Sequence, residues 1–235
     1  MLEAAIERGL VGKKQQLRSR SAYPVAEVRD VRLRDGRQVC VRPTRTSDSG
    51  AMQELFHRLP EQDVESRFLQ KLSSLTDTVA QYLCSVDYEQ EMAFAAVVGP
   101  SERERIVAAS SYYLSPATGL AEVAYMVDPE WQGAGLAGLL HARMFEYARE
   151  RGVRGFRADV LVGNTPMMRV FQRAGHQLRV KTSAGIEEVT MLFPDYMAEQ
   201  LLAARGYRRP RRPSGWLPVP VRLGSGERSV RDQRA

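Results

Sequence analysis

The sequence predicts a mixed α/β (α+β) fold in which a mostly antiparallel central sheet is flanked by helices. Three strand-like runs, at residues 91–98, 105–114 and 119–127, follow one another across short, turn-rich gaps, which makes them neighbours in an antiparallel meander. The hydrophobic period then changes from about two residues to the helical period of about 3.6 over residues 135–151.

The segment before the meander predicts a hairpin and two helices. Residues 28–43 alternate apolar and polar side chains around Asp35-Gly36, which is a strong hairpin signal. Ser47 or Asp48 is suited to cap a following helix, and a second helix is predicted over residues 75–86. The first of these helices repeats its apolar side chains at Met52, Leu55, Phe56 and Leu59.

The segment after the meander begins with the amphipathic helix over residues 135–151. A later helix has Asn164 or Thr165 as its cap and Gly175 as its end. The remaining predicted elements are a strand over 156–162, the later helix over 165–175, and a hairpin that pairs 176–181 with 187–193.

Length and composition allow one medium domain with extensions. The 235 residues are 43% hydrophobic and 26% charged, as in a soluble globular protein. No run approaches the roughly 18 apolar residues that a membrane span needs, and the first residues lack the apolar core of a signal peptide. A cytoplasmic protein with no membrane association is therefore expected. Cys40 and Cys84 are expected to be buried free thiols.

The positive charge is confined to the end of the chain. Of the net +6, residues 205–235 contribute +7 through nine arginines and two acidic residues, which leaves the first 204 residues at −1. We predict a flexible or helical extension over 1–24, one folded domain over 25–204, and a mobile, basic, Pro/Gly/Arg-rich tail over 205–235. Because the folded body carries no net positive charge, nucleic-acid binding is expected, if at all, only through this tail.

A glycine-rich loop is the most informative segment of the chain. VDPEWQGAGLAGLL, residues 127–140, joins a predicted strand to a predicted helix. Backbone N–H groups and a helix N-terminus would then face one point, which suits a pyrophosphate. The alternative is a tight turn that uses glycine only for its backbone geometry. The loop lacks the Gly-Lys-Ser/Thr of a Walker A loop, and antiparallel strands precede it, unlike the Rossmann arrangement.

These residues resemble the GNAT superfamily of acyl-CoA-dependent N-acetyltransferases. The hallmark Gln/Arg-x-x-Gly-x-Gly/Ala after the fourth strand is matched at every position from Gln132 to Ala137. Asn164, the helix to Phe171, and Gly175 resemble the next motif, and the resemblance covers about residues 38–193. DGRQVCVRPTRTSD, ELFHRL, ESRFLQ, VDYEQEMAF and AEVAYMV look most like the catalytic domain of bacterial Pat-type protein lysine acetyltransferases.

The resemblance implies the GNAT fold, with a V-shaped cofactor cleft between strands 4 and 5, and acetyl-CoA as the co-substrate. Backbone groups of residues 125–127 would bind the pantetheine arm as an added strand, and residues 132–138 would bind the pyrophosphate. The cofactor-binding residues implied are Tyr125, Met126, Val127, Gln132, Gly133, Ala134, Gly135, Leu136, Ala137, Gly138, Asn164 and Phe171.

Glu122 is the candidate general base. It is the only ionisable residue besides Tyr125 in GLAEVAYMV, and strand alternation places it on one face with Ala124 and Met126. A lysine amine, with a pKa near ~10.4, must lose a proton before it attacks a thioester. In the Pat-type resemblance, a glutamate at this position is the proposed base. The alternative is a solvated glutamate near the start of a strand.

A general acid is not identified. Phe171 stands where many family members have a proton-donating tyrosine. The hydroxyl-bearing candidates, each equally suited to packing, are Tyr125, Tyr112, Tyr113 and Ser111. The three histidines are expected in different positions. His57 is expected to be a solvated helix residue and His176 a half-buried strand residue. His141 is expected either to face the phosphates or to lie on the surface. No His/Cys cluster has metal-ligand spacing, so no metal is expected.

The sequence favours an acetyl-CoA-dependent N-acetyltransferase that transfers the acetyl group to a protein lysine by direct attack in a ternary complex. A protein with an exposed lysine is the expected partner, and an acyl-CoA synthetase is one candidate. The acidic residues that could attract a basic acceptor, or simply be solvated, are Glu61, Asp63, Glu65, Asp87, Glu89 and Glu91. The alternatives are a small-molecule amine N-acetyltransferase and a non-catalytic acyl-CoA-sensing module.

Overall fold

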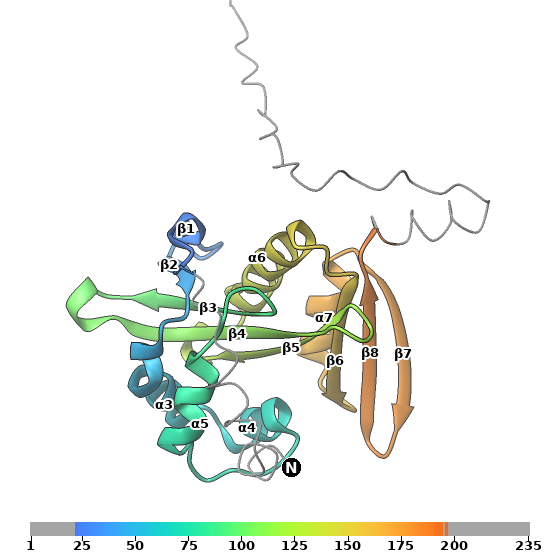
Figure 1. Cartoon of the computed structure of the whole chain (residues 1–235). Coiled ribbons are helices and arrows are strands. Elements are labelled where there is room, and N and C mark those ends of the chain that lie inside the picture. Colours follow the sequence, from blue (N-terminus) through green and yellow to red (C-terminus); the bar gives the residue numbers. More distant parts are fainter. Residues whose placement is uncertain (1–21, 195, 197–235) are drawn as a thin grey trace, which may run out of the picture.

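The computed structural model describes residues 22–194 and residue 196, which form an eight-stranded sheet with helices on both faces (Figure 1). The strand order is β1-β2-β3-β4-β5-β6-β8-β7. The strands are β1 (Arg29–Arg32), β2 (Gln38–Pro43), β3 (Glu91–Val98), β4 (Arg105–Ser115), β5 (Leu120–Val127), β6 (Gly155–Leu161), β7 (Gln177–Ser183) and β8 (Ile186–Leu192). The helices are α3 (Ser49–Arg58), α4 (Glu61–Phe68), α5 (Asp77–Cys84), α6 (Leu136–Glu150) and α7 (Thr165–Arg173).

The predicted sheet is confirmed. Strands β3, β4 and β5 form the expected antiparallel meander, and β1 pairs with β2 as the expected hairpin. Among the described strands only β5 and β6 pair in parallel, because α6 carries the chain back across the sheet between them. In Figure 1, β6, β8 and β7 run at a steep angle to β3, β4 and β5.

Two apolar layers cover the sheet. Side chains of α3, α4 and α5 pack with one face of β3, β4 and β5, whereas α6 and α7 pack with the opposite face. Alternation along β5 divides its residues between them, since Met126 belongs to the first layer and Val123 to the second. As predicted, Glu122 thus shares a face with Met126 and is directed toward the side of α3, α4 and α5.

Helix α4 is the one described helix that the sequence interpretation missed. Its eight residues, EQDVESRF, bury only Val64 and Phe68, which are spaced four residues apart, and a proline stands at its N-cap. Two apolar positions are too few for a periodic signal to be recognised. The helix is held instead by packing of these two side chains in the layer beneath α3 and α5.

The composition also led to expectations about the cysteines, membrane spans and the two ends of the chain, and the described residues bear on the first two. Cys40 and Cys84 are both free thiols, as expected. Cys84 is buried, also as expected, whereas Cys40 is half-buried and thus more exposed than expected. No helix in the described part of the chain is long and apolar enough to cross a bilayer. The predicted tail over 205–235 and nearly all of the predicted extension over 1–24 lie outside the described residues.

A buried ionic cluster fixes the start of α3 against the sheet. Arg42 of β2, only 2% exposed, donates to both carboxylate oxygens of Asp48 at 2.8 and 2.9 Å. It also donates to Glu104, just before β4, at 2.7 and 3.0 Å. Asp48 in turn accepts from the backbone N–H of Arg45 at 2.7 Å. One arginine therefore joins β2 to the start of α3, six residues later, and to the segment before β4, 62 residues later.

Replacing Asp48 with alanine is expected to lower the free energy of unfolding by about 3 kcal/mol, because a buried guanidinium loses its bidentate partner. Urea unfolding at neutral pH, followed by circular dichroism, measures the change. Asp35→Ala is the matched control, since Asp35 pairs with Arg37 at an exposed hairpin, and it should leave the urea midpoint unchanged. Equal midpoints for the two variants would contradict the assigned role of the cluster.

Candidate active site

The sheet opens between β5 and β6. Their pairing covers only Leu120 to Glu122 of β5, opposite Gly155 to Arg157 of β6. Beyond Glu122 the two strands diverge, although β4 stays paired with β5, and β8 with β6, over their whole lengths. Among the described strands, none pairs with the edge of β5 from Val123 to Val127 on its β6 side. Such an edge can accept an extended ligand through main-chain hydrogen bonds.

The exit from β5 is held by a buried carboxylate. Asp128 is 1% exposed and accepts from Arg58 of α3 at 2.6 Å and from Arg105 of β4 at 2.8 Å. Its other oxygen accepts from the backbone N–H of Glu130 at 3.1 Å. Burial alone would raise the pKa of Asp128, but the hydrogen bonds from Arg105 and Arg58 hold it below its usual value. Asp128 therefore stays charged and fixes the direction in which the glycine loop leaves the sheet.

The glycine loop presents a series of unpaired N–H groups. Among the described residues, no acceptor binds the backbone N–H groups of residues 133–138, and the first paired one is that of Leu139, which bonds to the carbonyl of Gly135. Gly133 and Gly135 have φ of 76° and 92°, which residues with a side chain rarely adopt. A side-chain carbon built at Gly133, Gly135 or Gly138 would meet no atom within 4 Å.

Open space, free donors and the N-terminus of the 15-residue helix α6 converge at this loop. The site therefore fits the pyrophosphate of an acyl-CoA, which needs N–H donors and positive potential and cannot approach past side chains. Gln132 is turned elsewhere, since its side-chain amide donates to Asp63 of α4 at 2.7 Å and to the carbonyl of Val127 at 3.3 Å. Of the predicted residues, Gly133, Gly135 and Gly138 thus border open space, whereas the side chains of Ala134 and Leu136 are buried in the core.

Glu122 lies where β5 leaves β6. In the register it stands between Tyr113 of β4 and Arg157 of β6, so the three side chains share one face of the sheet. Arg157 is directed away from it, to Glu188 at 2.9 Å and Asp159 at 3.5 Å. The carboxylate of Glu122 is exposed and forms no hydrogen bond or ion pair with a described residue. It is therefore free to accept a proton from an incoming group.

Two tyrosines form a wall beside Glu122. Tyr82 of α5 stacks on Tyr113 with the ring centroids 6.4 Å apart. Burial raises the pKa of both hydroxyls, and the negative charges of Glu91 and Glu122 raise that of Tyr82 further. Both tyrosines therefore stay neutral at physiological pH. An aliphatic stem can pack on their rings while its polar end reaches Glu122.

The opposite face of the opening is filled by aromatic side chains. The hydroxyl of Tyr125 and Nδ1 of His141 are 2.7 Å apart and hydrogen-bonded, and the Phe171 ring is 6.2 Å from Tyr125 and 5.7 Å from His141. His141 is 2% exposed, so the expectation that it faces phosphates or lies on the surface is wrong. His57 is exposed and His176 half-buried, as expected, although His176 precedes β7 and is not part of it.

The positions of the remaining candidates are less favourable for proton donation. Phe171 is fully buried, and the side chain of Asn164 caps α7 by accepting from the N–H of Met167 at 3.2 Å. Tyr112 is also fully buried, on the side of α6, and Ser111 is 6% exposed. Tyr125 has its hydroxyl engaged, and burial raises its pKa well above the usual value. No cluster of three metal-ligating side chains occurs among the described residues.

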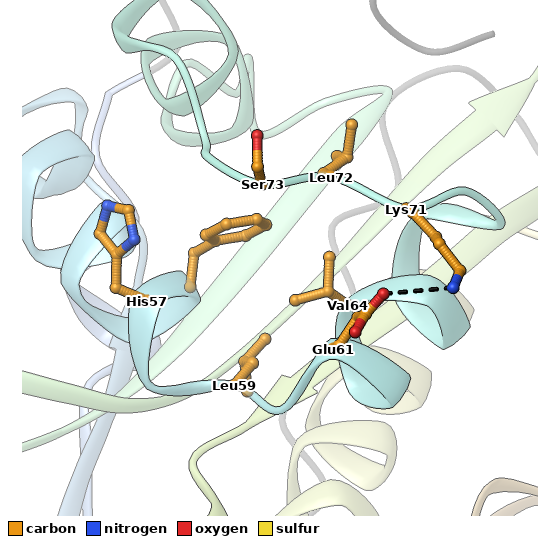
Figure 2. Close-up of a pocket in the computed structure, with 8 residues that line it drawn as sticks. His57, Leu59, Glu61, Val64, Lys71, Leu72 and Ser73 are labelled. Atoms are coloured by element: carbon orange, nitrogen blue, oxygen red, sulfur yellow. Dashed lines mark ion pairs between the residues drawn. The ribbon is translucent and has the colours of Figure 1, made fainter.

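A separate pocket lies on the far side of α4. A pocket of about 460 Å³ between α3, α4 and the segment after α4 has the floor residues Phe56, Leu59, Val64 and Leu72. Figure 2 shows Val64 and Glu61 of α4 directed toward it, with Glu61 paired to Lys71 at 3.2 Å across the rim. Asp63, on another face of α4, contacts the glycine loop instead. The pocket is thus separated from the opening between β5 and β6 by α4 itself.

Comparison with known proteins agrees with this geometry. The model of the acetyltransferase (GNAT) domain family matches residues 38–177, more than half of the chain. The protein belongs to the GNAT acetyltransferase family. As a GNAT acetyltransferase it is an N-acyltransferase that uses an acyl-CoA co-substrate. The opening between β5 and β6 corresponds to the cleft expected between strands 4 and 5, because the motif expected after the fourth strand, Gln132 to Ala137, follows β5.

Three individual proteins illustrate what this GNAT protein is similar to. It is 32% identical over 122 residues to an acetyltransferase of Pseudomonas aeruginosa, an alignment that covers 52% of this chain and 66% of the relative. The structure of the GNAT domain of PAT from S. lividans matches with a TM-score of 0.67 and 27% identity, covering 73% of this chain and all of that one. A cAMP-binding acyltransferase from Mycobacterium smegmatis matches with a TM-score of 0.51 and 22% identity, over 79% of this chain and 54% of that one, which shows the fold alone.

Two features of the site were not found by sequence interpretation. Asp63 and the rest of α4 carried too weak a periodic signal. The burial of His141 did have a signal, because Met144, Phe145 and Ala148 follow it with the spacing of one helical face. A histidine at that position lies on the same helical face as these apolar side chains, so its burial could have been predicted.

Replacing Gly135 with alanine is expected to raise the dissociation constant of acetyl-CoA at least about tenfold, because a side chain would enter the open point and the backbone conformation would become strained. Calorimetric titration with acetyl-CoA measures the change. Gly185→Ala is a matched control, since Gly185 has φ of 79° and open space around it but lies in the β7–β8 hairpin. A similar loss of affinity in both variants would mean that only general strain is measured.

His141 is expected to destabilise the protein in acid. Burial and the neighbouring His176 lower the pKa of His141 to about 4, from a usual value of 6.5. Between these values the unfolded chain binds the proton more readily, so stability falls as the pH decreases from about 6.5 to 4, by up to about 3 kcal/mol, and no effect is expected above this window. Urea midpoints of wild type and His141→Gln measured across pH 4–7 should converge toward the acid end. A constant difference would contradict the assignment, and His57→Gln should behave like wild type.

Proposed function

We propose that the protein transfers the acetyl group of acetyl-CoA to the side-chain amine of a lysine on another protein, with Glu122 as the general base. The observation that carries the proposal is the position of Glu122 at the last residue of β5 that pairs with β6. From there the open edge of β5 leads to the free N–H groups of the glycine loop, so a ligand lying along both would end beside this carboxylate.

The reaction is direct attack within a ternary complex. The acceptor enters as an ammonium, with a pKa near ~10.4, and the Glu122 carboxylate removes one proton, directly or through a water. The neutral amine then attacks the thioester carbonyl and the C–S bond breaks. The nitrogen, now joined to the acetyl group, loses its second proton to the departing thiolate, directly or through a water, which leaves a neutral amide and a free thiol. Main-chain groups of Val123 to Val127 and of the glycine loop hold the donor in place. No cysteine stands beside Glu122, which is consistent with transfer that has no acyl-enzyme step.

The leaving group needs no dedicated acid in this scheme. Phe171 has no proton to donate, and the hydroxyl of Tyr125 is held by His141. A thiol has a pKa of about 8.5, so a thiolate is stable enough to depart before it is protonated, and it then takes the proton that the acylated nitrogen releases, directly or through a water. The tyrosine that many family members carry at the position of Phe171 is therefore dispensable here.

The choice of a protein lysine as the acceptor is supported by two findings. One is the likeness to the GNAT domain of PAT, at 27% identity over the whole of that domain. The other is the shape of the acceptor side, where the Tyr82–Tyr113 stack leads to Glu122 and suits a long aliphatic stem that ends in a cation. Small amines that lack such a stem would make less use of this wall. An acyl-CoA synthetase with an exposed lysine is one candidate partner.

Glu122→Gln is expected to lower kcat/KM for acetyl transfer to a lysine peptide by about 10²- to 10⁴-fold, because the base is lost, and to leave the dissociation constant of acetyl-CoA within about twofold. Labelled acetyl-CoA and calorimetry measure the two quantities. Glu187→Gln on β8 is the control and should keep wild-type activity. Transfer by wild type with equal activity of Glu122→Gln would remove Glu122 from the mechanism. Binding of acetyl-CoA without transfer to any lysine would direct the search to small amines.

A further inference from the structure

Arg67, at the end of α4, lacks an anionic partner although it is half-buried. Among the described residues it forms no hydrogen bond and no ion pair, and its guanidinium carbon lies 4.9 Å from the centroid of the neighbouring Phe68 ring. Arginines withdrawn from water are normally paired, because an unpaired charge loses its hydration without compensation. The Arg67 guanidinium is therefore available to pair with an anion.

The acidic side chains near Arg67 do not pair with it. Asp63, one turn earlier on α4, is bound to Gln132 of the glycine loop at 2.7 Å. Glu122 is close enough to influence Arg67 electrostatically but forms no ion pair with it. Burial lowers the pKa of Arg67, and the negative charge of Glu122 and the Tyr113 hydroxyl only oppose this. The guanidinium is thus held near the base without neutralising it.

Arg67 lines a small recess on the acceptor side of the sheet. The recess, of about 10 Å³, is roughly the size of one water molecule. Its other lining residues are Met52, Leu83, Ala93, Ala109, Ser110, Ser111, Ala124 and Met126. Ala124 lies two residues beyond Glu122 on the same face of β5, in the part of the strand that β6 has left. The recess is therefore next to the point at which the proposed donor and acceptor meet.

We propose that Arg67 binds a carboxylate carried by one of the two substrates, either at the end of the acyl chain or on the acceptor beside the reacting amine. The Glu122 carboxylate then binds the ammonium of the acceptor, and the Arg67 guanidinium binds the carboxylate. Each of the two charged side chains thus pairs with a substrate group of opposite charge. A planar guanidinium binds a carboxylate through two parallel hydrogen bonds, which gives both affinity and orientation. This inference rests on the proposed function. It adds that one of the two substrates carries a carboxylate besides the groups that take part in the transfer.

The two sources of the carboxylate are distinguished by two matched pairs of probes. One pair is succinyl-CoA and acetyl-CoA, which differ by a terminal carboxylate on the acyl chain. The other is two lysine peptides that differ only in having aspartate or asparagine next to the lysine, each tested with acetyl-CoA. Dissociation constants are measured by calorimetry for both pairs, with the peptides titrated into protein that is saturated with CoA, and transfer rates are measured where transfer occurs.

Wild type is expected to prefer the carboxylate-bearing member of one pair by about tenfold or more, the effect of one charge-assisted pair. Arg67→Leu and Arg67→Gln should each abolish this preference while the neutral member of the pair changes less than about threefold, and Arg67→Lys should retain part of it. Arg34→Leu, which removes an equal charge from the exposed β1–β2 hairpin, should keep the preference. Arg67→Leu is apolar and Arg67→Gln is polar, so the test remains valid if one of the two variants fails to fold.

Two outcomes decide against the proposal, and a third separates it from the proposed function. No preference in either pair would mean that Arg67 does not bind a carboxylate. A preference that persists in Arg67→Leu would assign it to another residue. If wild type transfers acetyl to no peptide, the proposed function fails, but the calorimetric comparison of succinyl-CoA with acetyl-CoA, and of the two peptides, still decides the role of Arg67.

Discussion

The parting of β5 from β6 after three paired residues is the constraint on which the site depends. A sheet normally satisfies every internal N–H and carbonyl with a neighbouring strand, and an unpaired buried edge is costly. Here β5 is supported by β4 along its full length and β6 by β8, so each strand stays ordered without the other. The opening is therefore supported from both sides by paired strands, and a ligand lying along it as proposed would supply hydrogen bonds that the fold itself leaves out.

The alternation of β5 assigns different tasks to the two sides of this opening. The side of α6 and α7 is closed by Tyr125, His141 and Phe171, which pack as neutral aromatic groups and exclude water. The side of α4 and α5 is polar and accessible, with Glu122 and Arg67 both unpaired among the described residues. One side chain bridges the donor and acceptor regions, since Gln132 of the loop reaches Asp63 on α4. Chemistry is thus concentrated on one face, while the other provides support.

Sequence patterns were sufficient to predict those parts of the protein that depend on the spacing of apolar residues and on local backbone geometry. The meander follows from period-two alternation, the glycine loop from residue types that allow positive φ, and the orientation of Glu122 from its parity with Met126. What could not be predicted depends on tertiary packing. Helix α4 is held by two apolar contacts, so the sequence indicated neither the helix nor the positions of Asp63 and Arg67. The hydrogen bond that neutral His141 forms with Tyr125 likewise requires knowing which strand α6 covers.

The proposed recognition of the donor by main-chain groups has a consequence for divergence within the family. The loop's N–H groups are present whatever side chains flank them, so in this proposal a few glycines and the parting of two strands are enough to retain acyl-CoA. The acceptor side is built from side chains of α4, α5 and β4, each of which can change without disturbing that donor site. The two specificities can therefore evolve independently, which fits a fold kept at a TM-score of 0.67 when only 27% of the sequence is shared. Relatives with the same loop can thus be expected to share a donor class while differing in what they modify.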